Sequence, residues 1–235
     1  MISFLRDNQK RQTMFAGFIP FILFLMEVII MFITLEGGEG SGKTTVAKAL
    51  ITDFEARGYE VIYTREPGGN PIAESIREVI LDKENTDMDV RTEALLYAAA
   101  RRQHLVDVIE PALKAGKIVL CDRFIDSSIA YQGYARNIGP ELVAEINDFA
   151  IAGKRPDLTL LLNIRPEVGL ERINKDKNRE INRLDLEKLD FHHAVYHGYQ
   201  ELAAQNPARI VVINAELPVE AVVANVLKVI EARLS

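Results

Sequence analysis

One short run constrains what this chain can fold into more than any other part of the sequence. Residues 37–44 read GGEGSGKT and fit the pattern G-x-x-x-x-G-K-[ST]. An apolar run, Phe32–Glu36, leads into it, and a helical pattern begins at Lys43. Glycines let the backbone curl so that successive N–H groups face inward, where they can surround phosphate oxygens beside a helix N-terminus. The run therefore predicts a strand, a phosphate-binding loop and a helix, in that order.

The loop supplies the first candidate site residues. The side chain of Lys43 is expected to reach the β- and γ-phosphates of a nucleoside triphosphate, and the Thr44 hydroxyl to ligate Mg²⁺. ATP or GTP fits such a loop, but the N-K-x-D run with which GTPases read guanine does not occur in the sequence. The candidate ATP-binding residues are Gly37, Gly38, Glu39, Gly40, Ser41, Gly42, Lys43, Thr44 and Thr45.

Short β-rich runs alternate with longer helical patterns along the rest of the chain. The expected strands, most of them rich in Val, Ile and Leu, are Phe32–Glu36, Glu60–Thr64, Lys117–Asp122, Asp157–Asn163 and Arg209–Asn214. Helices are expected near residues 43–57, 71–82, 91–115, 140–152, 166–177, 184–205 and 219–233. This order predicts an α/β fold: one domain with a five-stranded parallel sheet flanked by helices.

The third expected strand ends in Asp122 and Arg123. In an open parallel sheet the carboxyl ends of the strands meet at one edge, so both residues should lie beside the phosphate loop. Asp122 is a candidate for holding the water shell of Mg²⁺, and Arg123 is placed to hold a second phosphate. A solvated strand end is the plainer alternative.

Other arginines also point to an acceptor site. Arg65 follows the second expected strand in TREPGG, whose turn would aim it over the sheet, and Arg77 lies on the next helix. Tyr97 and Arg101 are four residues apart and share a helix face, where a ring can stack on a base and a guanidinium can donate to it. A core tyrosine and a surface arginine are the alternative for this pair.

The polar run 174–183 contains Arg179 and Arg183, again four residues apart. A solvated surface loop is the plain interpretation of such a run. A lid whose arginines act as cationic fingers on a transferring phosphoryl group is the sharper one.

Two phosphate sites suggest transfer of a phosphoryl group onto a phosphate. That reaction needs no strong general base, because a phosphomonoester has a second pKa of about 6. Alignment and charge neutralisation would then carry catalysis. The histidines agree, because we expect none near the site motifs: His104 is on the helix 91–115, and His192, His193 and His197 are on a late helix. His193 and His197 are four residues apart and could mimic a metal pair, but without a clear third ligand we expect them at the helix surface. Cys121 is expected to pack inside a buried strand.

Several runs together resemble the bacterial-type thymidylate kinases. They are GGEGSGKTT at 37–45, TREPGG at 64–69, ALLYAAARRQH at 94–104 and CDRFIDSSIAYQGYAR at 121–136, while NREINRLD at 178–185 resembles the lid of that family. The phosphate loop is generic, whereas the combination of the other runs is specific. The resemblance covers nearly all of residues 31–235. It implies a P-loop kinase fold with a short lid near residues 172–185, usually a homodimer, which uses ATP and Mg²⁺ to convert dTMP to dTDP in dTTP synthesis.

The resemblance also implies roles for single residues around dTMP. Glu39 resembles the carboxylate that contacts the sugar, and Tyr131 resembles the residue that crowds its 2′ side and so favours deoxyribose. Tyr97 stands where the family usually stacks a Phe on thymine. The thymine readers are matched by Arg101, Ser128 and Gln132.

The remaining implied roles concern the phosphates. Arg65 and Arg123 resemble the clamps on the acceptor phosphate, with Arg77 beside the nucleotide. The phosphate loop lacks the arginine that some members carry there, so the lid should supply that charge. The candidate catalytic residues are Lys43, Asp122, Arg123, Arg179 and Arg183, and the candidate metal ligands are Thr44 and Asp122, partly through water. Phe124 stands where the family usually has a Tyr, and it offers no hydroxyl for a contact there.

The first thirty residues do not fit the domain. The apolar run at 14–26 follows Lys10 and Arg11, as in a signal peptide or membrane anchor. Pro20 and Glu27 interrupt it, and it is shorter than the roughly 18 residues of a membrane span. We expect Met31 to be the true start, and residues 1–30 to be an extension without a role in catalysis. The domain 31–235 would then be a cytoplasmic kinase that binds no nucleic acid and no membrane, in keeping with a net charge of -6 and one cysteine.

Two alternatives stay open at this point. One is another nucleoside or nucleoside monophosphate kinase. The other is a non-catalytic or membrane-associated nucleotide switch, which the apolar N-terminus would suit.

Overall fold

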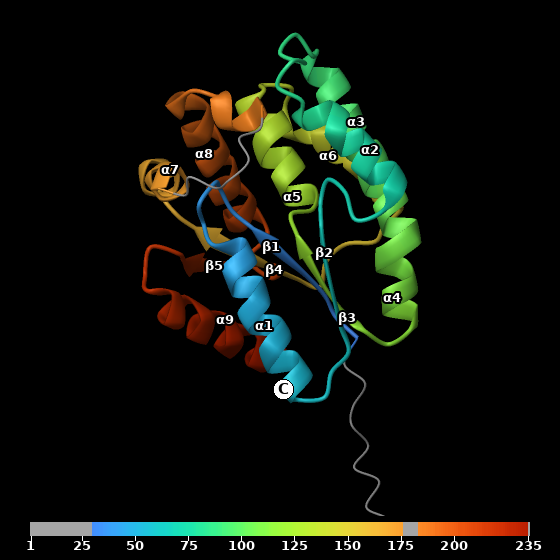
Figure 1. The fold of residues 1–235 in the computed structure, drawn as a ribbon, viewed down its shortest axis with the longest axis vertical. Coiled ribbons are helices and arrows are strands. Elements are labelled where there is room, and N and C mark those ends of the chain that lie inside the picture. Colours follow the sequence, from blue (N-terminus) through green and yellow to red (C-terminus); the bar gives the residue numbers. More distant parts are fainter. Residues whose placement is uncertain (1–29, 176–182, 235) are drawn as a thin grey trace, which may run out of the picture.

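The computed structural model describes residues 30–175 and 183–234. Five parallel strands form one sheet in the order β2-β3-β1-β4-β5 (Figure 1). Their bounds are β1 (Phe32–Glu36), β2 (Val61–Arg65), β3 (Ile118–Asp122), β4 (Leu158–Asn163) and β5 (Ile210–Asn214). The predicted five-stranded parallel sheet is confirmed. Because β1 is central and pairs with β3 on one side and β4 on the other, the loop after β1 begins in the middle of the sheet edge.

Helices connect the strands and cover both faces of the sheet. They are α1 (Lys43–Ala56), α2 (Pro71–Leu81), α3 (Val90–His104), α4 (Glu110–Lys114), α6 (Pro140–Ile151), α7 (Pro166–Lys175), α8 (Leu189–Gln205) and α9 (Val219–Leu234). The helix expected at 91–115 contains the π-helical segment η1 (Leu105–Ile109), which is followed by Pro111. Proline cannot donate the regular helical hydrogen bond, and a widened turn accommodates that loss.

Two predicted helix bounds differ from the structure. The helix expected at 184–205 begins only at Leu189, after the short 3₁₀ turn η3 (Arg183–Leu186). The helix expected at 166–177 is described as far as Lys175, and its last two positions lie outside the described residues.

The segment after β3 is helical, which the sequence analysis missed. It forms α5 (Ile125–Ser128) and the π-helical η2 (Ile129–Ala135). Two serines and Gly133 give this segment a weak intrinsic helix propensity. Burial holds it instead: Tyr131 packs its ring against Tyr199 of α8, with centroids 6.4 Å apart.

The core lies on both faces of the sheet. On one face α1 and α9 lie side by side and pack with the strands, and Figure 1 shows the pair together. On the other face η1 and α5 pack against β1 and β3, while α8 packs with η2 against β4 and β5. Within the described part of the chain, no helix combines the length and apolar character that a membrane crossing requires.

Candidate active site

The phosphate loop joins β1 to α1 as the sequence predicts. The ammonium group of Lys43 lies within the loop and donates to the carbonyl oxygens of Gly37 (3.0 Å) and Gly38 (3.1 Å) and to Ser41 Oγ (3.2 Å). Gly40 has a φ of +68°, and a Cβ there would lie 2.2 Å from the carbonyl oxygen of Gly169 on α7. Only glycine fits at that position, because α7 packs directly on the loop.

The electrostatics of the loop favour an anion. Among the described residues no side chain caps the N-terminus of α1, and its first turn contains no acidic residue. Its positive end and free N–H groups are therefore available to phosphate oxygens. Burial, and then the charge of Arg123, lower the pKa of Lys43 to about 8. A polyanion bound here would stabilise the charged form of this lysine.

One cavity of about 470 Å³ opens at the carboxyl edge of the sheet. It is large enough for a nucleotide, since ligand pockets span roughly 300–1,000 Å³. The predicted site residues in its wall are Glu39, Gly40, Ser41, Gly42, Lys43, Thr44, Thr45, Arg65, Arg77, Tyr97, Arg101, Asp122, Arg123, Ser128, Tyr131 and Gln132. Gly37 and Gly38 line a smaller neighbouring cavity. Residues from five separate stretches of sequence thus meet in one place.

Arg123 stands at the centre of this wall. Its Nη2 donates to Glu39 Oε1 (2.8 Å), its Nη1 donates to the carbonyl oxygen of Gly37 (3.1 Å), and its guanidinium lies over the Tyr131 ring. Tyr131 in turn donates its hydroxyl to the same Glu39 oxygen (3.0 Å). Arg123 has a φ of 69°, an uncommon conformation for a residue other than glycine, and such strain is found where function fixes a side chain.

Arg65 and Arg77 add positive charge on the β2–α2 side. Arg65 donates to Glu74 of α2 (3.1 Å), and both side chains of that pair are well exposed. Arg77 donates to the carbonyl oxygen of Pro67 (2.9 Å). Burial, and then the charge of Arg65, lower the pKa of Arg77. Positive groups are therefore crowded where an acceptor phosphate would bind.

Arg101 is deeply buried, so the alternative of a surface arginine is wrong. It donates from Nε to Glu66 (2.7 Å), from Nη1 to Ser128 Oγ (2.9 Å) and to Asn147, and from Nη2 to the carbonyl oxygen of Phe124 (2.9 Å). Four of the five N–H groups of its guanidinium are thus used within the described protein. One N–H is left for a ligand in the cavity that Arg101 lines.

The expectation that no histidine lies near the site motifs is wrong. His104 is fully buried beneath the TREPGG turn, with Nδ1 2.9 Å from Glu66 Oε1 and Nε2 2.6 Å from Thr64 Oγ1. It contacts Glu66 behind Arg101 and does not itself line the cavity. The surface prediction is confirmed for His193 and His197, and the neighbouring His192 is buried. Cys121 is buried in β3 as expected.

Thr44 and Asp122 form a donor set that suits a hard divalent cation. The hydroxyl of Tyr63 donates to Asp122 Oδ2 (3.4 Å) and also interacts with Thr44. The Thr44 hydroxyl and the Asp122 carboxylate are therefore close enough for one side chain to reach both. Oxygen ligands of this kind, completed by waters and phosphate oxygens, are what Mg²⁺ prefers.

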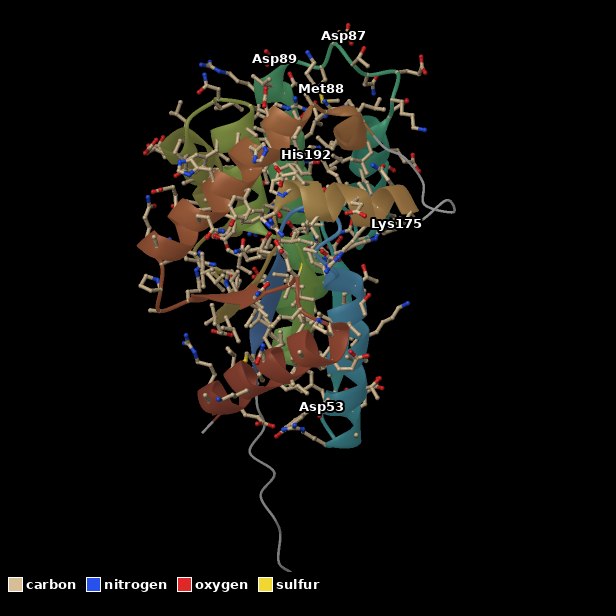
Figure 2. The ribbon with its side chains drawn as sticks, turned by 90° about the vertical axis from the view of Figure 1, so that its left-hand side faces the viewer. Asp53, Asp87, Met88, Asp89, Lys175 and His192 are labelled. Atoms are coloured by element: carbon tan, nitrogen blue, oxygen red, sulfur yellow. The ribbon has the colours of Figure 1, made fainter. Side chains whose placement is uncertain are left out.

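The two predicted lid arginines do not both meet the loop. Arg183 is buried and donates to the carbonyl oxygen of Ile80 (3.0 Å), to Glu93 Oε2 (2.5 Å) and to Met88 Sδ (3.9 Å). Figure 2 shows Met88 at the end of the molecule opposite Asp53 of α1. The structure thus places Arg183 with α2 and α3, and its role at a phosphoryl group stays a prediction. Arg179 lies outside the described residues.

Several site residues escaped the sequence analysis. Arg172 of α7 lines the cavity and donates to the carbonyl oxygens of Gly40 (3.4 Å) and Ala215 (2.9 Å). Glu36 lies behind the loop and accepts from the Phe124 N–H (2.7 Å) and the Tyr199 hydroxyl (2.9 Å). A charged residue at the end of an apolar strand was a signal for Glu36. Arg172 gave no such signal, because in the sequence it looks like any other charged residue on a helix surface.

The sheet order, the loop and the arginine-lined cavity define a P-loop kinase. A sequence profile of thymidylate kinase matches residues 35–226. Thymidylate kinase of Bacillus pumilus (strain SAFR-032) is 57% identical over 204 residues, which are 87% of this chain and 96% of that protein. Thymidylate kinase of Clostridium novyi (strain NT) is 61% identical over 191 residues, 81% of this chain and 93% of that protein. The crystal structure of thymidylate kinase from Ehrlichia chaffeensis superimposes with a TM-score of 0.68 at 35% identity, covering 85% of this chain and 98% of the other. The chain belongs to the thymidylate kinase family.

Proposed function

We propose that this chain transfers the γ-phosphoryl group of ATP to dTMP, giving ADP and dTDP. One observation carries the proposal beyond family membership: a phosphate loop and a separate cluster of arginines line the same cavity. Such an arrangement brings a donor phosphate and an acceptor phosphate together at a single sheet edge. The role assigned to each residue is part of the proposal.

The donor phosphates bind the loop N–H groups and the Lys43 ammonium, in place of the carbonyl and hydroxyl oxygens that now accept from that lysine. Arg65 and Arg123 hold the acceptor phosphate, and Arg77 adds charge beside them. An acceptor phosphate oxygen forms the new bond to the γ-phosphorus while the bond to the β–γ bridging oxygen breaks. Because that acceptor oxygen is already ionised at neutral pH, no side chain has to remove a proton.

The rest of the cavity selects the acceptor. Tyr97 offers a ring face to a base, Arg101 one N–H and Gln132 an amide. Tyr131, held by Glu39, limits the room beside the sugar. Thr44 and Asp122 would hold Mg²⁺, which would neutralise negative charge on the donor phosphates.

A substrate panel tests the proposal. The purified full chain is given ATP, Mg²⁺ and each of dTMP, dUMP, dCMP, AMP and UMP, and ADP release is coupled to NADH oxidation. We expect by far the highest kcat/KM with dTMP. Strong activity on AMP or UMP with none on dTMP would contradict the proposal.

A kinase acting on a free nucleoside is the nearest rival, and it needs no acceptor-phosphate clamp. An Arg65→Ala variant separates the two. We expect its KM for dTMP to rise at least tenfold while its KM for ATP stays near that of the wild type. Unchanged activity would favour the rival.

We also propose that the protein is a cytoplasmic homodimer. Helix α3 packs against both α2 and α6 (Figure 1). The exposed surface of these three helices includes the apolar residues Ile72, Val79, Leu95, Leu142 and Phe149. Phe149 is 90% exposed, which a partner copy would correct. Sedimentation of the wild type and of Phe149→Glu tests this: we expect a dimer for the wild type and a weakened dimer for the variant, and a monomeric wild type would contradict the proposal.

A start at Met31 stays a prediction, and residues 1–29 lie outside the described residues.

A further inference from the structure

Glu93 of α3 is a buried carboxylate next to the part of the cavity wall that Tyr97, Arg101 and Gln132 form, and it has no role in the proposed function. Gln132 donates to it from Nε2 (2.8 Å), Arg136 from Nε (3.3 Å) and Arg183 from Nη2 (2.5 Å). Both Glu93 and Gln132 are 1% exposed, yet only Gln132 lines the cavity. Gln132 therefore stands between Glu93 and any base bound there.

We infer that Glu93 determines base selectivity by fixing which side of the Gln132 amide faces the cavity. An ionised carboxylate has only acceptor atoms, so the amide atom that faces it must be the nitrogen. The carbonyl oxygen of Gln132 is then turned to the other side. Among the described residues no protein group donates to that oxygen, which leaves it available to a ligand.

Two cations, Arg136 and Arg183, keep Glu93 ionised. Burial opposes its ionisation, but Arg136, the Gln132 amide and Arg183 together hold its pKa below the usual value. The acidic neighbour Glu187 pairs with Arg136 from the far side, with a distance of 2.7 Å. Glu93 thus stays an acceptor throughout the neutral range, and the direction of the Gln132 amide does not change with pH.

The amide direction has a consequence for the choice of base, which rests on the proposed function. Gln132 presents an acceptor, and Arg101 has one N–H left as a donor. Thymine and uracil offer the matching edge, an N3–H donor beside a C4 carbonyl acceptor. Cytosine offers an N3 acceptor and an amino donor, so both of its groups would face a group of the same kind. A site that leaves buried polar groups unpaired rejects such a ligand strongly.

Replacing Glu93 by glutamine tests the inference. The new amide can present either its oxygen or its NH₂ group, so Gln132 becomes free to turn over and donate to cytosine N3. We expect the ratio of kcat/KM for dTMP to that for dCMP to fall about tenfold, the effect of one hydrogen bond. The ratio for dTMP to dUMP should not change, because these two bases share the same edge. Arg101 keeps rejecting the cytosine amino group, so dCMP remains the poorer substrate.

Glu187→Gln is the matched control. It removes the same charge from the same Arg136, but in the described part of the chain the Gln132 side chain donates to Glu93 and not to Glu187. Its dTMP/dCMP ratio should equal that of the wild type. A purely structural role of Glu93 predicts a different result, an equal loss of activity on dTMP, dUMP and dCMP, and that result would overturn the inference.

Gln132→Met provides a second variant if Glu93→Gln does not fold. It removes the amide while leaving the Arg183–Glu93 pair in place, and it should lower the dTMP/dCMP ratio by a similar factor. An unchanged ratio in this variant would also overturn the inference. A wild-type chain without activity on dTMP would instead refute the proposed function, so the two failures are distinguishable.

Discussion

Substitution of Arg101 by methionine should unfold the protein at a much lower temperature as well as impair base recognition. Arg101 and Glu66 are 1% and 2% exposed and lie 2.7 Å apart. Methionine fills a similar volume but leaves the Glu66 carboxylate buried, with His104 as its remaining side-chain partner among the described residues. The loss would also leave Ser128, Asn147 and the Phe124 carbonyl without the donor that now satisfies them.

The size of the effect follows from this geometry. Removing one partner of a buried ion pair costs about 3–5 kcal/mol. In a domain of this length each kcal/mol lowers Tm by roughly 2–4 °C, so we expect a fall of about 10 °C. Calorimetry or circular dichroism would measure it, with urea unfolding to give the free energy.

Two further variants separate the effect of the buried charge from that of an exposed ion pair. Arg155→Met breaks an ion pair with Asp148 whose side chains are 49% and 53% exposed, and it should cost less than about 1 kcal/mol. In the double variant Arg101→Met/Glu66→Gln the unpaired charge is gone, so part of the lost stability should return. An Arg101→Met protein that unfolds at the wild-type temperature would contradict this prediction. So would a double variant whose loss in unfolding free energy exceeds the sum of the losses of the two single variants.

Three other predictions concern the phosphate loop and its surroundings. Burial, and then Asp126, raise the pKa of Glu36 from 4.5 to about 7, so the wild type loses stability as the pH rises through this range. Between pH 4.5 and about 8, the free energy of unfolding of Glu36→Gln, measured with urea, should rise relative to that of the wild type by on the order of 3 kcal/mol. If the unfolding free energies of the two proteins changed with pH in parallel, this prediction would be contradicted. Because the Lys43 ammonium titrates at about pH 8, ATP binding measured calorimetrically should weaken about tenfold from pH 7 to pH 9, whereas a flat profile would exclude this lysine as the group responsible. A Cβ on Gly169 would lie 2.2 Å from the Glu39 carbonyl oxygen, so Gly169→Ala should push α7 off the loop and raise the KM for ATP several-fold; a wild-type KM would show that the loop can yield.

The sheet and the loop could be predicted because their signals are local. The apolar run Phe32–Glu36 and the glycines after it determine a strand and a tight loop within a dozen residues. The helical segment after β3 could not be predicted in the same way. Its helix depends on Tyr131 packing against a residue on α8, far along the chain, and not on its own propensities.

Two buried carboxylates behind the site, Glu36 and Glu93, were missed for a related reason. Glu36 meets Tyr199 across 163 residues of sequence, and Glu93 meets Arg183 across 90. Glu93 looks like an ordinary helix charge in the sequence. The position of Glu36 at the end of an apolar strand was a signal, but the sequence did not show which residue it would contact. His104 is a similar case: without the Glu66 contact, a histidine on a helix gives no sign of lying beneath the site motif.

Burial separates the arginines that can exchange partners from those that cannot. Arg65 and Glu74 are 46% and 38% exposed, and such a pair contributes about 0–1 kcal/mol, so an arriving phosphate can replace the carboxylate at little cost. The Arg101–Glu66 pair has no such freedom, because separating the two would leave each buried charge without its ion-pair partner. One arginine is therefore suited to follow a substrate that binds and leaves, and the other to present a fixed donor to a base. The sequence contains both as the same residue type, and only the depth at which each lies assigns the two tasks.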